Sequence, residues 1–197
     1  MEHLETYIAF DLEFNTVDHV SHIIQVSAVK YYKHQEIATF DTYVYTDVPL
    51  QSFINGLTGI TADKIKKAPV IEKVMADFKT FVASTPLIGY NAKKSDLPLL
   101  LAHELDLREN YMVDVYEEAK KRRSKDLNGI SNLQLHTVAK FLEISGKSHN
   151  SLEDARMTAL VYEKFCEFDD NTALLDKQEE VTNNPFANLN LSDILSE

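Results

Sequence analysis

The chain has 197 residues, 44% of them hydrophobic, and a formal net charge of −11 at pH 7. This length is sufficient for one hydrophobic core of ordinary size, whereas the acidic balance argues against a protein that holds nucleic acid through a positive surface alone. No run of about 18 apolar residues occurs, the N-terminus lacks the features of a signal peptide, and the single cysteine excludes an internal disulfide, so we expect a cytoplasmic protein without a membrane span.

The N-terminal part of the chain is rich in strand-forming residues, and the rest alternates between helical and strand patterns. The patterns predict strands near residues 6–14, 22–32, 36–46 and 86–89, and helices near residues 61–67, 70–84, 96–106, 114–123, 131–142 and 151–168. Short connections among the first three strands indicate an antiparallel meander. Three strands followed by alternating helices and strands predict an α/β fold with a mixed sheet flanked by helices.

The first predicted strand carries two acids, Asp11 and Glu13, in an otherwise apolar stretch. Side chains alternate between the two faces of a strand, so the acids share one face while Phe10, Leu12 and Phe14 share the other. Two like charges on one face are costly unless water or a cation compensates them. The pair therefore indicates either an edge strand whose polar face meets water or a site for divalent cations.

A second acid, Asp96, follows the apolar run Leu87–Gly89 and a polar turn. A helix is expected to start at Ser95 or Asp96, because Pro98 is tolerated in a first helical turn. Asp96 is then either an acid that satisfies free amides at the helix start or a member of a functional site.

A third acidic position opens the last predicted helix. With Ser151 as the expected N-cap, Glu153 and Asp154 fall in the first turn, where acids are favourable without any catalytic role. His149 precedes the cap, so a loop carries it beside the helix end. It is either an ordinary exposed histidine or a proton acceptor beside the acids.

Together these positions resemble, in order and spacing, the three motifs of the DEDDh superfamily of 3′-to-5′ exonucleases, which includes the proofreading subunit of bacterial replicative DNA polymerase. The matching residues are Asp11 and Glu13 for the first motif, Asp96 for the second, and His149 with Asp154 for the third. The sister branch has a tyrosine four residues before the last aspartate, where this chain has Asn150. The chain therefore resembles the histidine type, over about residues 5 to 168.

The resemblance implies a ribonuclease-H-like mixed five-stranded sheet and two divalent cations, Mg²⁺ or Mn²⁺. Asp11, Glu13, Asp96 and Asp154 would be the metal ligands, and His149 the general base. Two such ions can activate a water and stabilise the leaving oxygen in phosphodiester hydrolysis. The implied activity is release of nucleoside 5′-monophosphates from single-stranded or unpaired DNA 3′ ends, as in proofreading. An RNA-trimming exonuclease of the same superfamily and a catalytically silent accessory protein of a replication complex are the alternatives.

The resemblance extends to the segment that lines the terminal-nucleotide pocket, Leu57–Thr61 followed by Ala68 and Pro69. It implies that Phe14, Asn15, Leu57 and Thr58 touch the terminal nucleotide. Three positions depart from the family pattern: residues 14–16 replace its usual Thr-Thr-Gly or Met-Thr-Gly, Thr58 replaces a histidine, and Ser95 replaces a phenylalanine. Substrate preference is therefore left open, while every metal ligand is present.

Positive charge is concentrated in Lys120–Arg123 with Lys125. This cluster either follows the backbone of a strand that enters the site or is the solvated end of a helix.

The composition becomes more polar after residue 168, so we expect an exonuclease domain over residues 1–168 and a C-terminal extension over residues 169–197. Spaced apolar residues make this extension either a docking segment or a loosely packed one. Asn188–Leu191 faintly resembles the tails that bind sliding clamps. A DNA polymerase or a sliding clamp is therefore an expected partner besides the nucleic acid 3′ end.

Overall fold

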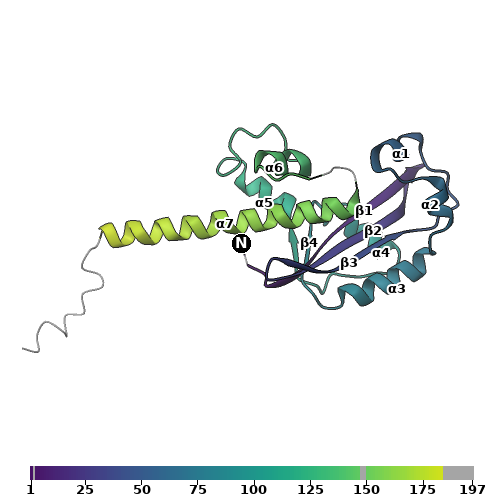
Figure 1. The fold of residues 1–197 in the computed structure, drawn as a ribbon, viewed down its shortest axis with the longest axis horizontal. Helices are drawn as coiled ribbons and strands as arrows, with labels where there is room; N and C mark the ends of the chain where they lie inside the picture. The colour runs from purple at the N-terminus through teal and green to yellow at the C-terminus, as the bar shows by residue number, and fades with distance from the viewer. Residues whose placement is uncertain (2, 147–149, 184–197) are drawn as a thin grey trace, which may run out of the picture.

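The computed structural model describes residues 1, 3–146 and 150–183, and side chains as far as residue 176. A five-stranded sheet forms its centre, with strand order β3-β2-β1-β4-β5 (Figure 1). The strands are β1 (Thr6–Val17), β2 (Val20–Tyr32), β3 (Gln35–Tyr43), β4 (Leu87–Gly89) and β5 (Met112–Asp114). The β1–β2 and β2–β3 pairs are antiparallel, and the β1–β4 and β4–β5 pairs are parallel. The mixed sheet is confirmed, and the strand with the two acids is central, which removes the edge-strand interpretation.

Two tight turns connect the first three strands. Asp18 and His19 join β1 to β2 with φ values of 49° and 65°, and Lys33 and His34 join β2 to β3 with φ values of 46° and 65°. Two consecutive left-handed residues are the mark of the type I′ hairpin turn, whose twist matches that of the flanking strands. The expected antiparallel meander is therefore present.

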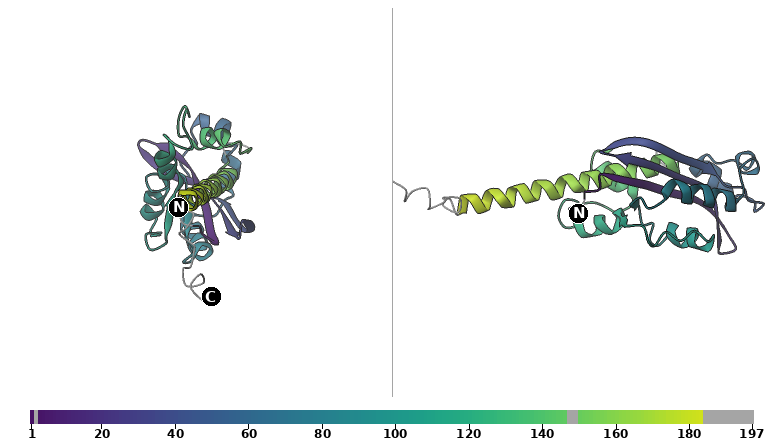
Figure 2. Two further views of the ribbon diagram at one scale, coloured as in Figure 1. Left: turned by 90° about the vertical axis from the view of Figure 1, so that its left-hand side faces the viewer. Right: turned by 90° about the horizontal axis from the view of Figure 1, so that it is seen from below.

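Helices cover both faces of the sheet (Figure 2). Ile8, Phe10 and Leu12 of β1 share a core with α3 (Ile71–Val82) and with residues of α4 (Asp96–Ala102). Tyr7 and Ala9 point to the other face and pack with residues of α5 (Val115–Arg122), α6 (Leu135–Phe141) and α7 (Ser151–Asn183). Because Asp11 and Glu13 follow Tyr7 and Ala9 in the period-two pattern, they share the face that α7 covers.

Two short helices, α1 (Ser52–Thr58) and α2 (Ala62–Lys66), follow β3. They are separated by Gly59, whose φ of 70° lies in the left-handed region, and they pack on β2 through Ile24, Ile54, Ile60 and Ile65. Neither α1 nor the three-residue β5 was predicted from the local patterns, although the family resemblance implies a five-stranded sheet. Both are too short for a hydrophobic period to reveal them, and Ile54 is the only buried residue of α1.

The last helix begins at Ser151, as its predicted range does, but its capping residue and its C-terminal end differ from the prediction. Asn150, not Ser151, is the cap, because its Oδ1 accepts hydrogen bonds from Leu152 N at 3.1 Å and Glu153 N at 3.4 Å. The helix was expected to end at residue 168 but runs to Asn183, since residues 169–183 contain no glycine or proline to stop it. Its second half extends beyond the sheet (Figure 1). None of the helices in the described ranges is both long and apolar enough to cross a membrane.

Candidate active site

Three of the predicted acids meet above the centre of the sheet. Asp11 and Glu13 of β1 and Asp154 of α7 each offer a carboxylate oxygen, and these oxygens all lie within 4.8 Å of one another. The convergence follows from packing: α7 lies across β1 and β2, and Asp154 is in its first turn. Residues about 140 positions apart in the sequence therefore form one acidic cluster.

The fourth predicted acid, Asp96, is hydrogen-bonded to the same stretch of β1. Its Oδ1 accepts a hydrogen bond of 3.1 Å from the backbone N–H of Leu12, the residue between the two strand acids. Its Oδ2 accepts a hydrogen bond from the hydroxyl of Ser95, and the residue is only 4% exposed. Asp96 does open α4, but its carboxylate contacts β1, which favours the functional-site interpretation over simple capping.

The turn that delivers Asp96 needs an unusual backbone. A Cβ on Gly89 would lie 2.4 Å from the Cβ of Ala92, so no larger residue fits there. Asn91 has a φ of 59°, which asparagine tolerates better than most residues. Asp114 then holds the turn, with Oδ1 accepting from Asn91 N at 2.9 Å and Oδ2 from Lys93 N at 3.1 Å. This role of Asp114 was not predicted from the sequence, where residue 114 only begins an expected helix.

Burial and mutual repulsion raise the pKa values of the acids. Burial and then the charges of Asp96, Glu13 and Asp154 hold the pKa of Asp11 well above its usual range. The pKa of Glu13 is raised to about 7, by burial and then by Asp154 and Asp96. Burial also raises the pKa of Asp96 to about 6, although the hydrogen bonds from Ser95 and Leu12 oppose the shift. The raised pKa values mean that the folded protein disfavours the charged forms of these carboxyl groups. A bound cation would therefore stabilise the cluster.

A chain of polar contacts lies beside the cluster on the same face of the sheet. Ser27 pairs with Asp11 in the β1–β2 register, and its hydroxyl donates to Asp41 Oδ1 at 2.8 Å. The Ser27 hydroxyl has one proton, so in its 2.5 Å contact with Ser151 the Ser151 hydroxyl is the donor. Gln25 Nε2 also donates to Asp41 Oδ1, at 2.7 Å. These contacts fix the start of α7, and with it Asp154, against the strands.

Two histidines are relevant to the site. His149, the predicted general base, lies outside the described residues. His136, at the start of α6, places Nε2 at 3.5 Å from Asp154 Oδ1, a contact that sequence reasoning did not anticipate. Its only sequence signal is a polar residue at the start of a mostly apolar helix.

The candidates for the terminal nucleotide occupy different environments. Phe14 and Leu57 present exposed apolar side chains, 37% and 45% accessible. The Thr58 hydroxyl donates to Ile54 O at 2.9 Å within α1.

Asn15 is fully buried instead. Its Nδ2 donates to Pro49 O at 3.1 Å, and its Oδ1 accepts from Gln51 N at 3.0 Å. Both ends of the amide are thus used to hold the segment before α1, and the contact of Asn15 with the terminal nucleotide stays a prediction.

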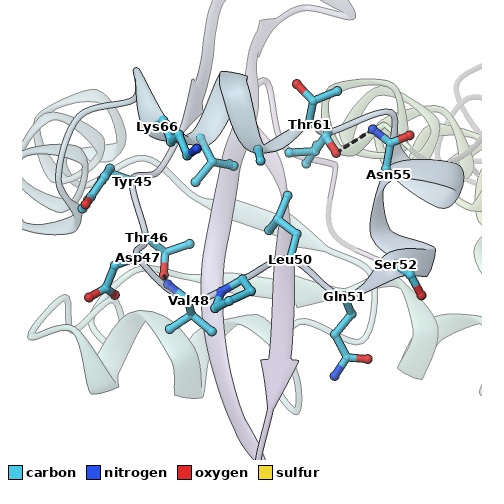
Figure 3. Close-up of a pocket in the computed structure, with 14 residues that line it drawn as sticks. Tyr45, Thr46, Asp47, Val48, Leu50, Gln51, Ser52, Asn55, Thr61 and Lys66 are labelled. Carbon is cyan, nitrogen blue, oxygen red and sulfur yellow. Dashed lines mark hydrogen bonds between the residues drawn. The ribbon is translucent and has the colours of Figure 1, made fainter.

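A separate cavity of about 680 Å³ lies between residues 45–52 and the two short helices (Figure 3). Apolar residues such as Val48, Leu50 and Ile65 form much of its lining. None of the four acids lines it, so it is distinct from the acidic cluster.

Comparison with known proteins agrees with this geometry. The family model described as "Exonuclease" matches residues 8–162. A curated relative, the PolC-type DNA polymerase III of Caldanaerobacter subterraneus subsp. tengcongensis, is 33% identical over 166 residues, which are 82% of this chain and 12% of the relative. The PolC-type DNA polymerase III of Streptococcus pneumoniae is 34% identical over 128 residues, 59% of this chain and 9% of the relative. The chain thus spans about a tenth of these relatives.

Solved structures share the fold at low sequence identity. The nuclease domain of 3′hExo, described as a DEDDh family member bound to rAMP, has a TM-score of 0.64 at 18% identity, covering 83% of this chain and 92% of its own. Escherichia coli Exonuclease I with a dA16 oligonucleotide has a TM-score of 0.64 at 17% identity, covering 79% and 39% of the two chains. The expected ribonuclease-H-like fold is confirmed. The chain therefore belongs to the exonuclease family, whose model matches most of its length.

Proposed function

We propose that this domain is a metal-dependent 3′-to-5′ exonuclease that releases nucleoside 5′-monophosphates from single-stranded or unpaired DNA 3′ ends. The observation that carries the proposal is the convergence of Asp11, Glu13 and Asp154 within 4.8 Å, with Asp96 bonded to the strand between the first two. DNA is the proposed substrate because the curated relatives are DNA polymerases.

The donor set fits hard divalent cations. All four groups are carboxylates, and Mg²⁺ and Mn²⁺ prefer oxygen ligands. We assign Asp11, Glu13, Asp96 and Asp154 to hold two such ions. When bound, the ions would activate a water and stabilise the charge that develops on the leaving oxygen. The raised pKa values of Glu13 and Asp96 support the assignment. Burial and repulsion destabilise the charged carboxylates, and a bound cation would offset both effects.

Further roles are proposed for residues outside the acidic cluster. His149 is proposed to take the proton of the attacking water, since an imidazole with an ordinary pKa near ~6.5 accepts protons at neutral pH. Phe14 and Leu57 offer exposed apolar surface for the terminal nucleotide. Asn15 supports this pocket through the backbone of residues 49–51.

A DNA polymerase is the partner that the comparisons favour. In each PolC-type relative the matched segment is a small part of a DNA polymerase. We propose that this domain likewise removes nucleotides from 3′ ends that a polymerase extends.

A nuclease assay with 5′-labelled oligonucleotides tests the function and the substrate together. We expect stepwise shortening of single-stranded and mismatched DNA 3′ ends in Mg²⁺ or Mn²⁺, and none in EDTA. Asp154→Asn should abolish shortening, whereas Asp170→Asn, a change at an exposed acid of the same helix, should not. A matched RNA oligomer decides between the DNA and RNA enzymes, because contacts at the 2′ position distinguish them. Absence of metal-dependent shortening on every 3′ end would leave the accessory-protein alternative.

A further inference from the structure

A groove of about 790 Å³ is formed by segments that lie near the acids in the sequence. Its walls come from the turn after β4, from α5 and from the segment before α6, and they include Tyr90, Lys94, Tyr116 and Arg123. The first of these walls ends at Lys94, two residues before Asp96 in the sequence. The other ends at Leu135, next to His136, which contacts Asp154. Two walls of the groove therefore continue along the chain into residues of the proposed metal site or in contact with it.

The lining combines aromatic, basic and neutral polar side chains. The rings of Tyr90 and Tyr116 meet edge to face, with centroids 5.9 Å apart and planes at 66°. The Tyr90 hydroxyl donates to Leu133 O at 2.6 Å, which fixes that ring. No acid is among the residues that line the groove, although the chain carries 31 acids against 20 basic residues. This surface is therefore an exception to the acidic character of the protein.

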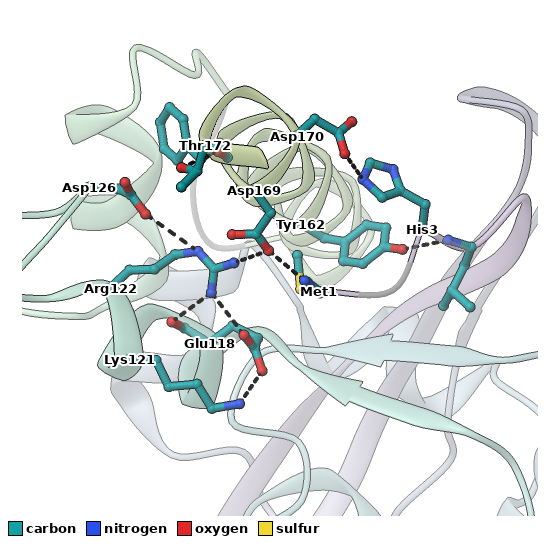
Figure 4. A network of polar contacts seen from close by, with 12 residues as sticks. Met1, His3, Glu118, Lys121, Arg122, Asp126, Tyr162, Asp169, Asp170 and Thr172 are labelled. Atoms are coloured by element: carbon teal, nitrogen blue, oxygen red, sulfur yellow. Dashed lines mark hydrogen bonds and ion pairs between the residues drawn. The ribbon is translucent and has the colours of Figure 1, made fainter. Parts of the chain in front are cut away.

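The basic cluster of residues 120–125 divides between two environments. Lys120 and Lys121 pair with Glu117 and Glu118. Arg122 turns inward, bonding Glu118 at 2.8 Å and Asp169 at 2.6 Å (Figure 4).

Arg123 lines the groove instead. Within the described ranges, neither Arg123 nor Lys94 has a carboxylate within ion-pair distance. Their charges are thus available to a ligand. The pairs of Lys120 and Lys121 fit the solvated helix end, whereas a basic cluster that follows a nucleic-acid strand stays a prediction.

We propose that this groove binds the nucleotides that precede the terminal one in a single strand, with bases stacked on Tyr116 and phosphates beside Lys94 and Arg123. The proposal rests on the exonuclease function argued above. A positive groove with aromatic side chains is the recurring means of holding single-stranded nucleic acid. The strand would lead from the groove to the acids, with its last nucleotide beyond them toward α1. In Figure 1 the first turn of α7 lies between α1 and α6, as this path requires.

Two substrates separate the groove from the catalytic centre. The p-nitrophenyl ester of thymidine 5′-monophosphate has one nucleotide and nothing to place in the groove, whereas single-stranded oligothymidylate fills it. For Arg123→Ala we expect the KM for the oligonucleotide to rise on the order of tenfold, because a charge-assisted contact is lost. This rise in the KM for the oligonucleotide should exceed any change in the KM for the ester. The slope of log affinity against log salt should fall by about 0.7, the value for one phosphate contact on a single strand.

Matched variants control for charge and for folding. Lys125→Ala removes the same charge from an exposed residue two positions away that does not line the groove, and it should bind oligothymidylate as the parent protein does. Tyr116→Ala should weaken oligonucleotide binding roughly 5- to 150-fold, the range for a lost base stack, while Tyr116→Phe should retain it. Circular dichroism of each variant checks that the fold is intact.

The outcomes are distinguishable. If the parent protein cleaves neither substrate with Mn²⁺, the exonuclease function fails. If it cleaves both, but Arg123→Ala and Tyr116→Ala degrade the oligonucleotide as fast as Lys125→Ala and Tyr116→Phe, the groove is not the strand site. An equal loss on the ester and the oligonucleotide would also overturn the proposal, because it would place the defect in the catalytic centre.

Discussion

Replacing Asp11 by asparagine should change stability in opposite directions without and with metal. Asp11 lies in a cluster whose carboxylate oxygens are all within 4.8 Å. Two unit charges at that separation repel by about 3.5 kcal/mol at an effective dielectric constant of about 20. Asp11→Asn removes one charge and both of its contacts, with Glu13 and Asp154. Part of the repulsion is already relieved by proton uptake, since the pKa of Asp11 is well above its usual range.

In EDTA at pH 8 we therefore expect Asp11→Asn to raise the free energy of unfolding by about 1–3 kcal/mol. In a chain of this length each kcal/mol raises Tm by roughly 2–4 °C. With metal the order of the two stabilities reverses, because the intact site gains about 4.1 kcal/mol when the metal concentration is about 1,000 times Kd. Hydrolysis of the oligonucleotide should fall by roughly a thousandfold or more, since each ~1.4 kcal/mol of lost metal stabilisation is tenfold.

Thermal unfolding followed by circular dichroism, with and without Mn²⁺, measures both effects on one sample. Asp18→Asn is the matched control: it makes the same change of charge and shape at an exposed turn residue, and asparagine tolerates its left-handed backbone. An Asp11→Asn variant that is less stable than the parent in EDTA, or a parent whose Tm does not respond to metal, would refute the assignment of Asp11 to a metal cage.

Three further predictions concern the acids and their surroundings. In EDTA the free energy of unfolding should rise as the pH is lowered from about 8 to 5, because the raised pKa values of Glu13 (about 7) and Asp96 (about 6) let the folded state take up protons before the unfolded chain does. A Tm that is flat over this range would contradict it. Ser151→Ala should lower the free energy of unfolding by about 1–3 kcal/mol, since it removes the buried donor to Ser27. Urea unfolding measures this loss, which should be absent when an exposed serine is replaced by alanine. His149→Ala should lower kcat by roughly 10²- to 10⁴-fold with little change in Tm, and undiminished turnover would show that another group accepts the proton.

Much of the fold follows from local patterns in the sequence. The alternation in β1 places Asp11 and Glu13 on one face, and short polar breaks predict the hairpins that the type I′ turns form. These features depend on neighbouring residues only, so a sequence can reveal them. The end of α7 was predicted too early for the same reason: a change to polar composition does not by itself stop a helix that meets no glycine or proline.

The sequence by itself determined which acids the chain carries, the strand face that holds the first two, and the family that their order resembles. Only the tertiary structure decided that Asp96 bonds the backbone of Leu12, that Asn15 is buried under the segment before α1, and that Arg122 turns inward while Arg123 lines a groove. Adjacent residues can have opposite environments because packing between distant segments, not local periodicity, chooses which side of a helix end faces solvent. The site exists because α7 lies across β1, a contact between residues that are far apart in the chain.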